Sequence, residues 1–354
     1  MTVETFEWVG PYDRRLALGS AGLLHDLNRA GVLTAADVHV ARSLARVAHE
    51  QDEAAVLAAA LATRAVRLGS VAVDLAEVPD ALGEVTVPDE GDGSGDVVVA
   101  WPDPTTWTER VAASHLTTQG ALVVEHGLVY LQRYHHQEVQ VVRDLQARAD
   151  QSAPVVDQDV LEAGLVHVFP GDGYAEQRAA AAVAVRSWTT VLTGGPGTGK
   201  TTTVAGVLAL LAGQAAAVGA PPLRVGLAAP TGKAAARIQE AVRQAFEEIE
   251  QRAVDDGTRG LIAQLGDVPA VTLHRLLGRR PDSSTRFRHD RTHRLPHDVV
   301  LVDEASMVSL THMARLLEAL RPTTRLILVG DPDQLVSVDA GAVLADLVAG
   351  AEAL

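Results

Sequence analysis

A glycine-rich run that ends in lysine and threonine has the clearest chemistry in the sequence. Residues 194–201 read GGPGTGKT and fit the phosphate-loop pattern G-x-x-x-x-G-K-[ST]. Glycines let backbone N–H groups curl around phosphates, Lys200 can reach the β- and γ-phosphates, and the Thr201 hydroxyl can ligate Mg²⁺. A plain glycine-rich turn is the alternative, but the run also follows a strand-like segment and opens a helix-like one. We therefore predict that ATP and Mg²⁺ bind at Gly194, Gly195, Pro196, Gly197, Thr198, Gly199, Lys200, Thr201 and Thr202.

Two acidic residues follow a second apolar run. Residues 299–302 are all apolar and lead directly into Asp303 and Glu304, at the end of a predicted strand, where α/β proteins place their sites. Asp303 is placed to hold Mg²⁺, usually through water, and Glu304 can polarise an attacking water molecule. Two acids in this position could instead cap a helix. Their occurrence downstream of a phosphate loop favours the catalytic interpretation.

Two glutamines extend the predicted nucleotide site. Gln334 follows another apolar run, residues 326–329, after a Gly-Asp-Pro-Asp turn. A neutral amide there can sense a γ-phosphate, although Asp-Pro-Asp is also good turn chemistry and both interpretations can hold. Gln177 opens the helix-like segment before the phosphate loop. Its amide could read an adenine edge, but by itself it is an ordinary polar helix residue.

Two further strand–helix junctions have polar residues suited to nucleic-acid phosphates. Thr231 and Lys233 offer a hydroxyl and a cation at a helix start, although a solvated loop is an equally good interpretation. Thr272 and His274 could touch the backbone of a nucleic-acid strand, yet a lone histidine is often a structural residue. These four residues are candidate contacts to DNA.

Residues 279–297 are rich in basic side chains. Six arginines against two aspartates give this segment a net charge of +4, and Phe287 and three histidines are interleaved with them. A basic segment with an aromatic residue suits single-stranded nucleic acid. A solvated hairpin or loop is the alternative interpretation.

The apolar pattern predicts the elements that position these residues. From residue 171 onward, short β-branched runs alternate with helical stretches rich in alanine and leucine. Strands that are apolar almost throughout are covered on both faces, so we predict an α/β fold with a mostly parallel sheet and helices on both sides. The predicted strands are residues 189–193, 224–229, 298–302 and 325–329.

The first part of the chain has a different pattern. Residues 13–70 show helical spacing, residues 122–130 are two extended pieces around a His126-Gly127 turn, and a further helix runs to about Asp150. Residues 83–96 are an acidic, glycine-rich loop. We predict three parts, which are a mainly helical domain at 1–150, a linker at 151–170 and an α/β domain at 171–354.

Composition limits the class of protein. The net charge is −15, of which residues 1–170 contribute −14 and residues 171–354 only −1, so the acidic excess lies outside the part expected to bind DNA. Cysteine is absent, which excludes disulfides and cysteine-ligated metal centres. We find no apolar run long enough to cross a membrane and no secretory signal, and we expect a cytoplasmic protein without membrane attachment.

Five motifs follow one another along the chain, namely GGPGTGKTTT, APTGKAAARI, TLHRLLG, VVLVDEASM and LVGDPDQL. In this order and spacing they resemble the motifs of superfamily 1 DNA helicases of the 5′-to-3′ branch. They are most similar to those of the RecD family, the alpha subunits of exodeoxyribonuclease V (RecBCD). The resemblance implies that residues 171–354 are a RecA-like P-loop NTPase domain, the first of two motor lobes in the family. It also implies that residues 1–150 dock on a RecC-like subunit.

The resemblance further implies roles for individual residues. Gln177 would read adenine, and Gln334 would sense the γ-phosphate. Lys200 and Thr201 would hold the phosphates and Mg²⁺, and Asp303 and Glu304 would bind Mg²⁺ and activate water. The implied contacts to single-stranded DNA are Thr231, Lys233, Thr272 and His274.

Three functions remain open at this stage. The first is an ATP-dependent 5′-to-3′ helicase subunit that works on single- and double-stranded DNA with RecB- and RecC-like subunits in break repair and recombination. We recognise no nuclease site, so cleavage would belong to a partner. The second is a stand-alone RecD-like helicase, which usually has upstream helix–hairpin–helix segments that we do not find. The third is a nucleotide-binding fragment without turnover. The family's second lobe and its arginine would lie beyond Leu354, so we expect weak ATP binding and little hydrolysis by this chain alone.

Overall fold

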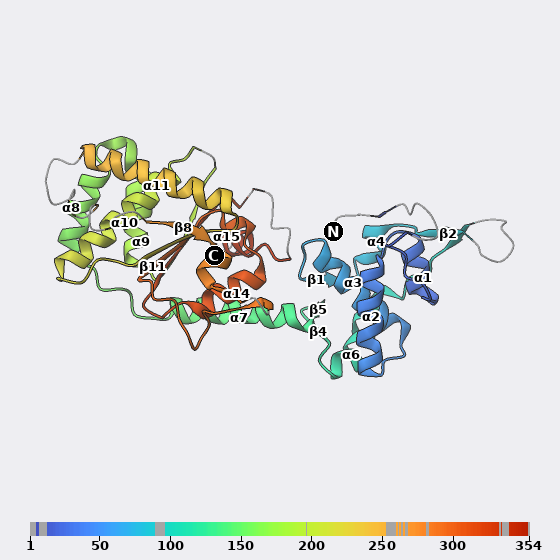
Figure 1. The fold of residues 1–354 in the computed structure, drawn as a ribbon. Helices are drawn as coiled ribbons and strands as arrows, with labels where there is room; N and C mark the ends of the chain where they lie inside the picture. The colour runs from blue at the N-terminus through green and yellow to red at the C-terminus, as the bar shows by residue number, and fades with distance from the viewer. Residues whose placement is uncertain are drawn as a thin grey trace. The chain divides into compact units, whose positions relative to one another are not determined.

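The chain divides into two compact units. The computed structural model describes residues 5–6, 13–88, 96–195, 197–252, 260, 262, 265, 268–280, 283–332, 334 and 340–352. The main part of the first unit is Met1–Val139, and that of the second is Gln140–Ser337. Figure 1 draws the chain from blue at the N-terminus to red at the C-terminus. No helix in the described part of the chain combines the length and the apolar character needed to cross a membrane.

The first unit is mainly helical, as its sequence pattern predicts. Helix α3 is its centre, because the run from Ala54 to Ala62 is buried on every side of the helix. The Trp107 ring is fully buried, and its Nε1 donates a hydrogen bond to the Ala54 carbonyl at 2.9 Å. The helices are α1 (Gly22–Arg29), α2 (Ala35–Ala48), α3 (Glu53–Arg67), α4 (Val78–Leu82), α5 (Pro104–Ala112) and α6 (His115–Thr118).

Short strands complete this unit. The prediction of a hairpin turn at His126-Gly127 is confirmed, since both residues have positive φ, 51° and 80°, as a two-residue turn of type I′ requires. The turn joins β4 (Leu122–Glu125) to β5 (Leu128–Leu131), and β1 (Ala72–Asp74) pairs with the other edge of β5. A separate antiparallel pair is formed by β2 (Thr86–Pro88) and β3 (Asp96–Val98).

The second unit contains the predicted parallel sheet. Its strand order is β6-β12-β11-β7-β8, and every neighbouring pair is parallel. In β11 the side chains alternate between the two faces, and all four residues are buried, so both faces of the sheet are covered. The strands are β6 (Thr189–Thr193), β7 (Val225–Ala229), β8 (Ala270–Thr272), β11 (Val299–Val302) and β12 (Arg325–Gly330).

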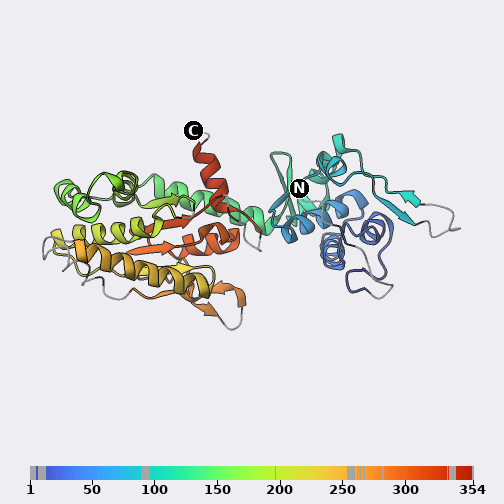
Figure 2. The same cartoon turned by 90° about the horizontal axis from the view of Figure 1, so that it is seen from above.

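Helices lie on both sides of this sheet (Figures 1 and 2). Buried side chains of the helices before and after β6 and of the helix after β7 form one core with the sheet, which includes Leu208, Ile238 and Leu301. The helices of this unit are α8 (Gln158–Val168), α9 (Ala175–Arg186), α10 (Lys200–Ala217), α11 (Gly232–Arg252), α13 (Leu273–Leu277), α14 (Leu310–Ala319) and α15 (Val343–Glu352). Two short 3-10 turns are η1 (Asp172–Tyr174) and η2 (Ala305–Met307).

Helix α8 lies within residues 151–170, which we expected to be a linker. Leu161 of this helix and the following Phe169 are fully buried. The Phe169 ring approaches α10 so closely that any side chain at position 206, a glycine, would overlap it. Residues 158–168 are therefore a packed helix instead of a free connection. The polar residues that suggested a linker lie on the exposed side of α8 and in the segment before it.

A buried arginine attaches helix α7 (Gln132–Ala149) to the sheet. Arg148 is 7% exposed, and its guanidinium donates to the carbonyls of Trp188 at 2.7 Å and Thr324 at 2.6 Å and to the Thr189 hydroxyl at 2.7 Å. Burial lowers the pKa of Arg148 to about 10, so it remains charged at neutral pH. The three acceptors lie at the amino ends of β6 and β12. Arg148 therefore holds these two ends together.

Two more arginines act at the same edge of the sheet. Asp298, just before β11, pairs with Arg224 at 2.9 Å and Arg321 at 2.8 Å. Burial alone would raise the pKa of Asp298, but hydrogen bonds from the side chain and backbone of Arg224 and from Arg321 lower it to about 2. These contacts join the amino ends of β7 and β11.

Substitution of Arg148 by methionine should destabilise the second unit. It leaves the Thr324 and Trp188 carbonyls without their buried donor, and we expect a loss of about 3 kcal/mol in the free energy of unfolding. Chemical denaturation followed by circular dichroism measures this loss. Arg143→Met, at an exposed position of the same helix, is the matched control and should change the free energy by less than about 0.5 kcal/mol. Equal effects of the two substitutions would contradict the role given to Arg148.

Substitution of Asp298 by asparagine should have a pH-dependent effect. The pKa of the folded carboxyl is below its ordinary value of 3.8, so its stabilisation is complete above that value and is lost as the pH falls towards 2. Because Asp298 is 33% exposed, we expect a difference of only about 1 kcal/mol between the variant and the unsubstituted chain at pH 7. Denaturation at pH 7, 4 and 2.5 should show the difference shrinking below pH 4. The same pH dependence in the exposed control Asp150→Asn would refute this assignment.

Candidate nucleotide and nucleic-acid site

The parallel sheet brings the predicted site residues to one edge. In parallel strands all carboxyl ends meet at the same edge, so the segments that follow β6, β12, β11, β7 and β8 lie there side by side in that order. Residues 194–199 follow β6, Asp331 follows β12, and Asp303 follows β11. Thr231 comes just after β7, and Thr272 ends β8. The nucleotide candidates therefore occupy one end of this edge, and the candidate DNA contacts occupy the other.

Two glycines of the glycine-rich loop occupy positions that disfavour a side chain. Gly199 has φ 82° directly before α10, a value that side chains rarely tolerate. Gly194 has φ 155°, and a Cβ there would lie 2.7 Å from the Thr198 Oγ1 atom. That hydroxyl donates to the Gly195 carbonyl at 3.0 Å and so closes the loop on itself. Pro196 was predicted to belong to this site but lies outside the described residues.

Lys200 folds back over the loop. Its Nζ donates hydrogen bonds to the carbonyls of Gly194 and Gly195, the latter at 2.8 Å. The ammonium group is therefore held at the loop that would receive phosphates, and it starts the helix whose N-terminal dipole also favours an anion. Thr201 and Thr202 follow in the first turn of α10 and are half-buried. This arrangement fits a nucleotide polyphosphate.

Asp303 provides a partly buried carboxylate close to the lysine. Burial is the largest influence and raises the pKa of Asp303, and the charge of Glu304 raises it further. The positive charges of Arg237 and Lys200 and a hydrogen bond from the Glu304 backbone oppose this rise in pKa. A desolvated carboxylate next to a second acid is stabilised by a nearby cation. Together with the Thr201 hydroxyl it supplies the hard oxygen ligands that Mg²⁺ prefers.

Glu304 has an unusual backbone. Its φ is 53°, one of the positive values that non-glycine residues rarely adopt. The chain turns sharply here from β11 into η2, which leaves both acids at the strand end. The Glu304 carboxylate lies 3.7 Å from the Arg237 guanidinium, which is 80% exposed on α11. Arg237 was not among the predicted site residues, although it lies one helical turn after Lys233.

Both glutamines lie where they could touch a nucleotide. The Gln177 side chain in α9 donates to the Thr198 carbonyl at 3.3 Å, and its Nε2 would lie 3.1 Å from a Cβ at position 199. Its amide therefore contacts the phosphate loop directly. Gln334 is exposed and donates to the buried Asp331 carboxylate at 3.3 Å. The turn after β12, which was the alternative interpretation of this segment, therefore positions Gln334.

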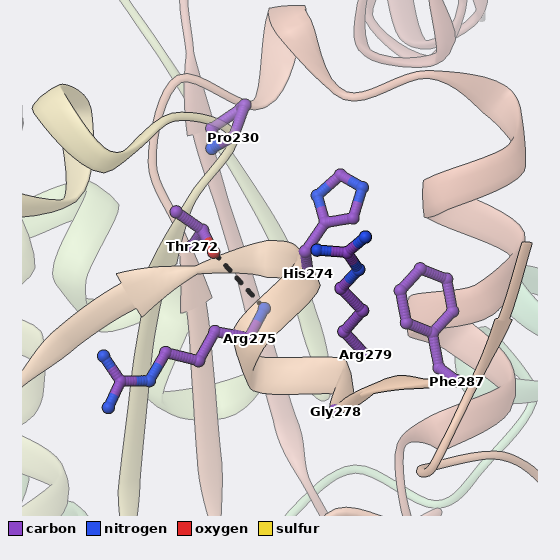
Figure 3. A pocket seen from close by; sticks show the side chains of 7 residues that line it. All are labelled: Pro230, Thr272, His274, Arg275, Gly278, Arg279 and Phe287. Carbon is purple, nitrogen blue, oxygen red and sulfur yellow. Dashed lines mark hydrogen bonds between the residues drawn. The ribbon is translucent and has the colours of Figure 1, made fainter. Parts of the chain in front are cut away.

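A cleft of about 750 Å³ lies at the other end of the edge (Figure 3). Thr272 caps α13, because its hydroxyl accepts a hydrogen bond from the Arg275 backbone at 3.3 Å, and His274 follows on the exposed side of that helix. Thr231 and Lys233 are exposed at the end of β7, and the Thr231 hydroxyl accepts from the Ala234 backbone at 3.2 Å. The cleft is lined by Pro230, Thr272, His274, Arg275, Gly278, Arg279 and Phe287.

The basic segment 279–297 is more involved in packing than its composition suggests. It contains β9 (Arg279–Arg280) and β10 (Ser283–Phe287), and Phe287 is only 6% exposed. Arg291 pairs with Asp144 at 2.8 Å, and Arg294 donates to the Leu320 carbonyl. Arg279 lines the cleft, as does Arg275, which the sequence analysis did not single out although it adjoins His274.

Family models match both halves of the chain. A model described as the N-terminal domain of the RecBCD enzyme subunit RecD matches residues 29–130. A model described as an AAA domain matches residues 177–340. The second match spans the sheet, the phosphate loop and the acidic pair, so the parts described above belong to one known domain type.

Similar proteins agree with these matches. The chain is 55% identical to the RecBCD enzyme subunit RecD of Mycolicibacterium smegmatis, over 91% of this chain and 53% of that protein. It is 50% identical to the subunit of the same name from Mycobacterium tuberculosis, over 96% of this chain and 54% of that protein. The ATP-dependent RecD2 DNA helicase of Deinococcus radiodurans is 42% identical over 43% of this chain and 16% of its own length. The chain spans about half the length of the RecD subunits that it matches. By its two matched domains and these relatives, the chain is similar to RecD subunits along most of its length.

Proposed function

We propose that this chain is the ATP-binding motor part of a 5′-to-3′ DNA helicase subunit. The observation that supports this most is the shared sheet edge. Lys200, Asp303 and Gln334 follow three adjacent strands, and the candidate DNA contacts follow the next two strands of the same sheet. A structural change in the segments at the nucleotide end of this edge is transmitted to the segments at the nucleic-acid end through the parallel sheet that connects them.

The contacts of these side chains support the following roles at the nucleotide end. Lys200 exchanges its two carbonyl acceptors for β- and γ-phosphate oxygens, and Gln177 reads the adenine edge from its position against the loop. Thr201 and Asp303 would hold Mg²⁺, which supplies positive charge against the phosphates when bound. Glu304 accepts a proton from the attacking water, and Gln334 contacts the γ-phosphate.

The roles at the other end are contacts to a single DNA strand. Thr231, Lys233, Thr272 and His274 provide hydroxyl, ammonium and imidazole donors, and phosphate oxygens accept hydrogen bonds from all three. Arg275 and Arg279 add positive charge to the cleft that Thr272 and His274 also line. Residues in this cleft bind the strand backbone and not particular bases, which suits a motor that works on any sequence.

The names of the relatives support a biological setting for the chain. Two of them are named as subunits of the RecBCD enzyme. We therefore assign the chain to a cytoplasmic complex with RecB- and RecC-like subunits that acts in break repair and recombination. Residues 1–150 would dock on the RecC-like partner, and residues 171–354 would be the motor lobe. The match of residues 29–130 to the RecD N-terminal domain favours this assignment over a stand-alone helicase.

Substitution of Lys200 by alanine tests the nucleotide end. Loss of the ammonium group removes a charge-assisted contact to the phosphates, so we expect the affinity for a fluorescent ATP analogue with Mg²⁺ to fall at least about tenfold. Equilibrium fluorescence titration measures this affinity. The chain contains one other lysine, Lys233, and Lys233→Ala should leave nucleotide affinity unchanged. Unchanged affinity in Lys200→Ala, or an equal loss in Lys233→Ala, would contradict the proposed site.

A further inference from the structure

A second histidine lies behind His274. His312 of α14 places its Nε2 atom 3.0 Å from the Nε2 atom of His274, and the two rings meet edge to face at 4.4 Å between centroids. The buried Phe287 ring packs against both, at 5.9 Å from His274 and 6.0 Å from His312. Because three rings contact one another, the orientation of the His274 imidazole is fixed by its neighbours.

The hydrogen bonds around this pair can all run in one direction, from Ser309 to His274. The Ser309 hydroxyl accepts a hydrogen bond from the His312 backbone at 3.4 Å and lies 2.9 Å from the Nδ1 atom of His312. An oxygen that accepts from the backbone still has its own proton to donate, and Nδ1 is the nearby acceptor. When the hydroxyl donates to Nδ1, His312 has its proton on Nε2 and donates it to Nε2 of His274. A neutral His274 must consequently have its own proton on Nδ1.

This tautomer suits the cleft. In Figure 3 one ring nitrogen of His274 faces the side where Pro230 and Thr272 lie. Its other nitrogen is the Nε2 atom occupied by His312. A protonated Nδ1 is a hydrogen-bond donor towards the cleft, and phosphate oxygens only accept. The opposite tautomer would present a lone pair, which repels a phosphate.

We infer that His312 is a positioning residue, which fixes His274 in the tautomer that donates a hydrogen bond to a phosphate of single-stranded DNA. This inference rests on the proposed DNA contact at His274. His312 lies in the helix that follows Asp303, Glu304 and η2. The series of contacts from Ser309 through His312 to His274 therefore starts a few residues after the acidic pair of the nucleotide site and ends in the cleft.

The test is the affinity of the chain for a fluorescein-labelled oligothymidylate, measured by anisotropy. His312→Phe keeps an aromatic ring against His274 and Phe287 but removes the donor. We expect it to weaken binding about fivefold, as His274→Ala does. In His312→Gln the amide can donate from nearly the same position as Nε2, so this variant should bind within about twofold of the unsubstituted chain. The double variant His274→Ala/His312→Phe should be no weaker than either single one, since both remove the same interaction.

Two controls separate positioning from folding. Affinity for a fluorescent ATP analogue should be unchanged in all these variants, and His136→Phe, at an exposed position, should leave strand affinity unchanged. ¹⁵N chemical shifts of the His274 ring should report a proton on Nδ1 in the unsubstituted chain and a loss of this preference in His312→Phe.

Specific outcomes would overturn the inference. These are full strand affinity in His312→Phe, a His312→Gln variant as weak as His312→Phe, or losses that multiply in the double variant. If the unsubstituted chain binds the strand but His274→Ala binds it equally well, the inference fails and the nucleotide site of the proposed function stands. If the unsubstituted chain does not bind the oligonucleotide, the proposed DNA end fails and the inference fails with it.

Discussion

The parallel pairing of five strands is the constraint on which the rest of the structure depends. Hydrogen bonds between parallel strands place every carboxyl end at one edge, and the pairing of Gly330 with Thr193 and of Val302 with Leu328 aligns the strand ends that matter. The phosphate loop, the acidic pair and the cleft residues are far apart in sequence. They become neighbours because each follows one of these strands. A shift of one residue in any pairing would also turn every side chain of that strand to the opposite face of the sheet.

The two edges of the sheet have opposite chemistry. At the amino edge, Arg148 and Arg325 donate to backbone carbonyls in buried surroundings, and burial lowers the pKa of each to about 10. Arg224 and Arg321 enclose Asp298 beside them. These contacts hold the amino ends of the strands in place, at an edge of the sheet where we propose no ligand. At the carboxyl edge, Lys200 donates to carbonyls of its own loop and Glu304 pairs with the exposed Arg237, and a ligand can replace these contacts.

Local pattern predicted much of this arrangement, and long-range packing accounts for the remainder. The phosphate loop, the strand before Asp303 and the His126-Gly127 turn were predictable because glycine placement and apolar runs act over a few residues. The insertion of β12 between β6 and β11 was not, because it depends on contacts between distant segments. Two features had no clear local signal, namely the packed helix α8 and the burial of Phe287 within a basic segment. His312 was missed for the same reason, since only the fold brings α14 to His274.

The central claim is that one sheet edge has a nucleotide end at β6 and a DNA end at β7 and β8. The two lysines of the chain lie one at each end, at positions 200 and 233. Amine-selective labelling read by mass spectrometry can therefore report on both ends in a single sample. We expect an ATP analogue with Mg²⁺ to protect Lys200 and leave Lys233 reactive, and oligothymidylate to protect Lys233 and leave Lys200 reactive. Protection of both lysines by either ligand alone, or the reverse pattern, would contradict the central claim.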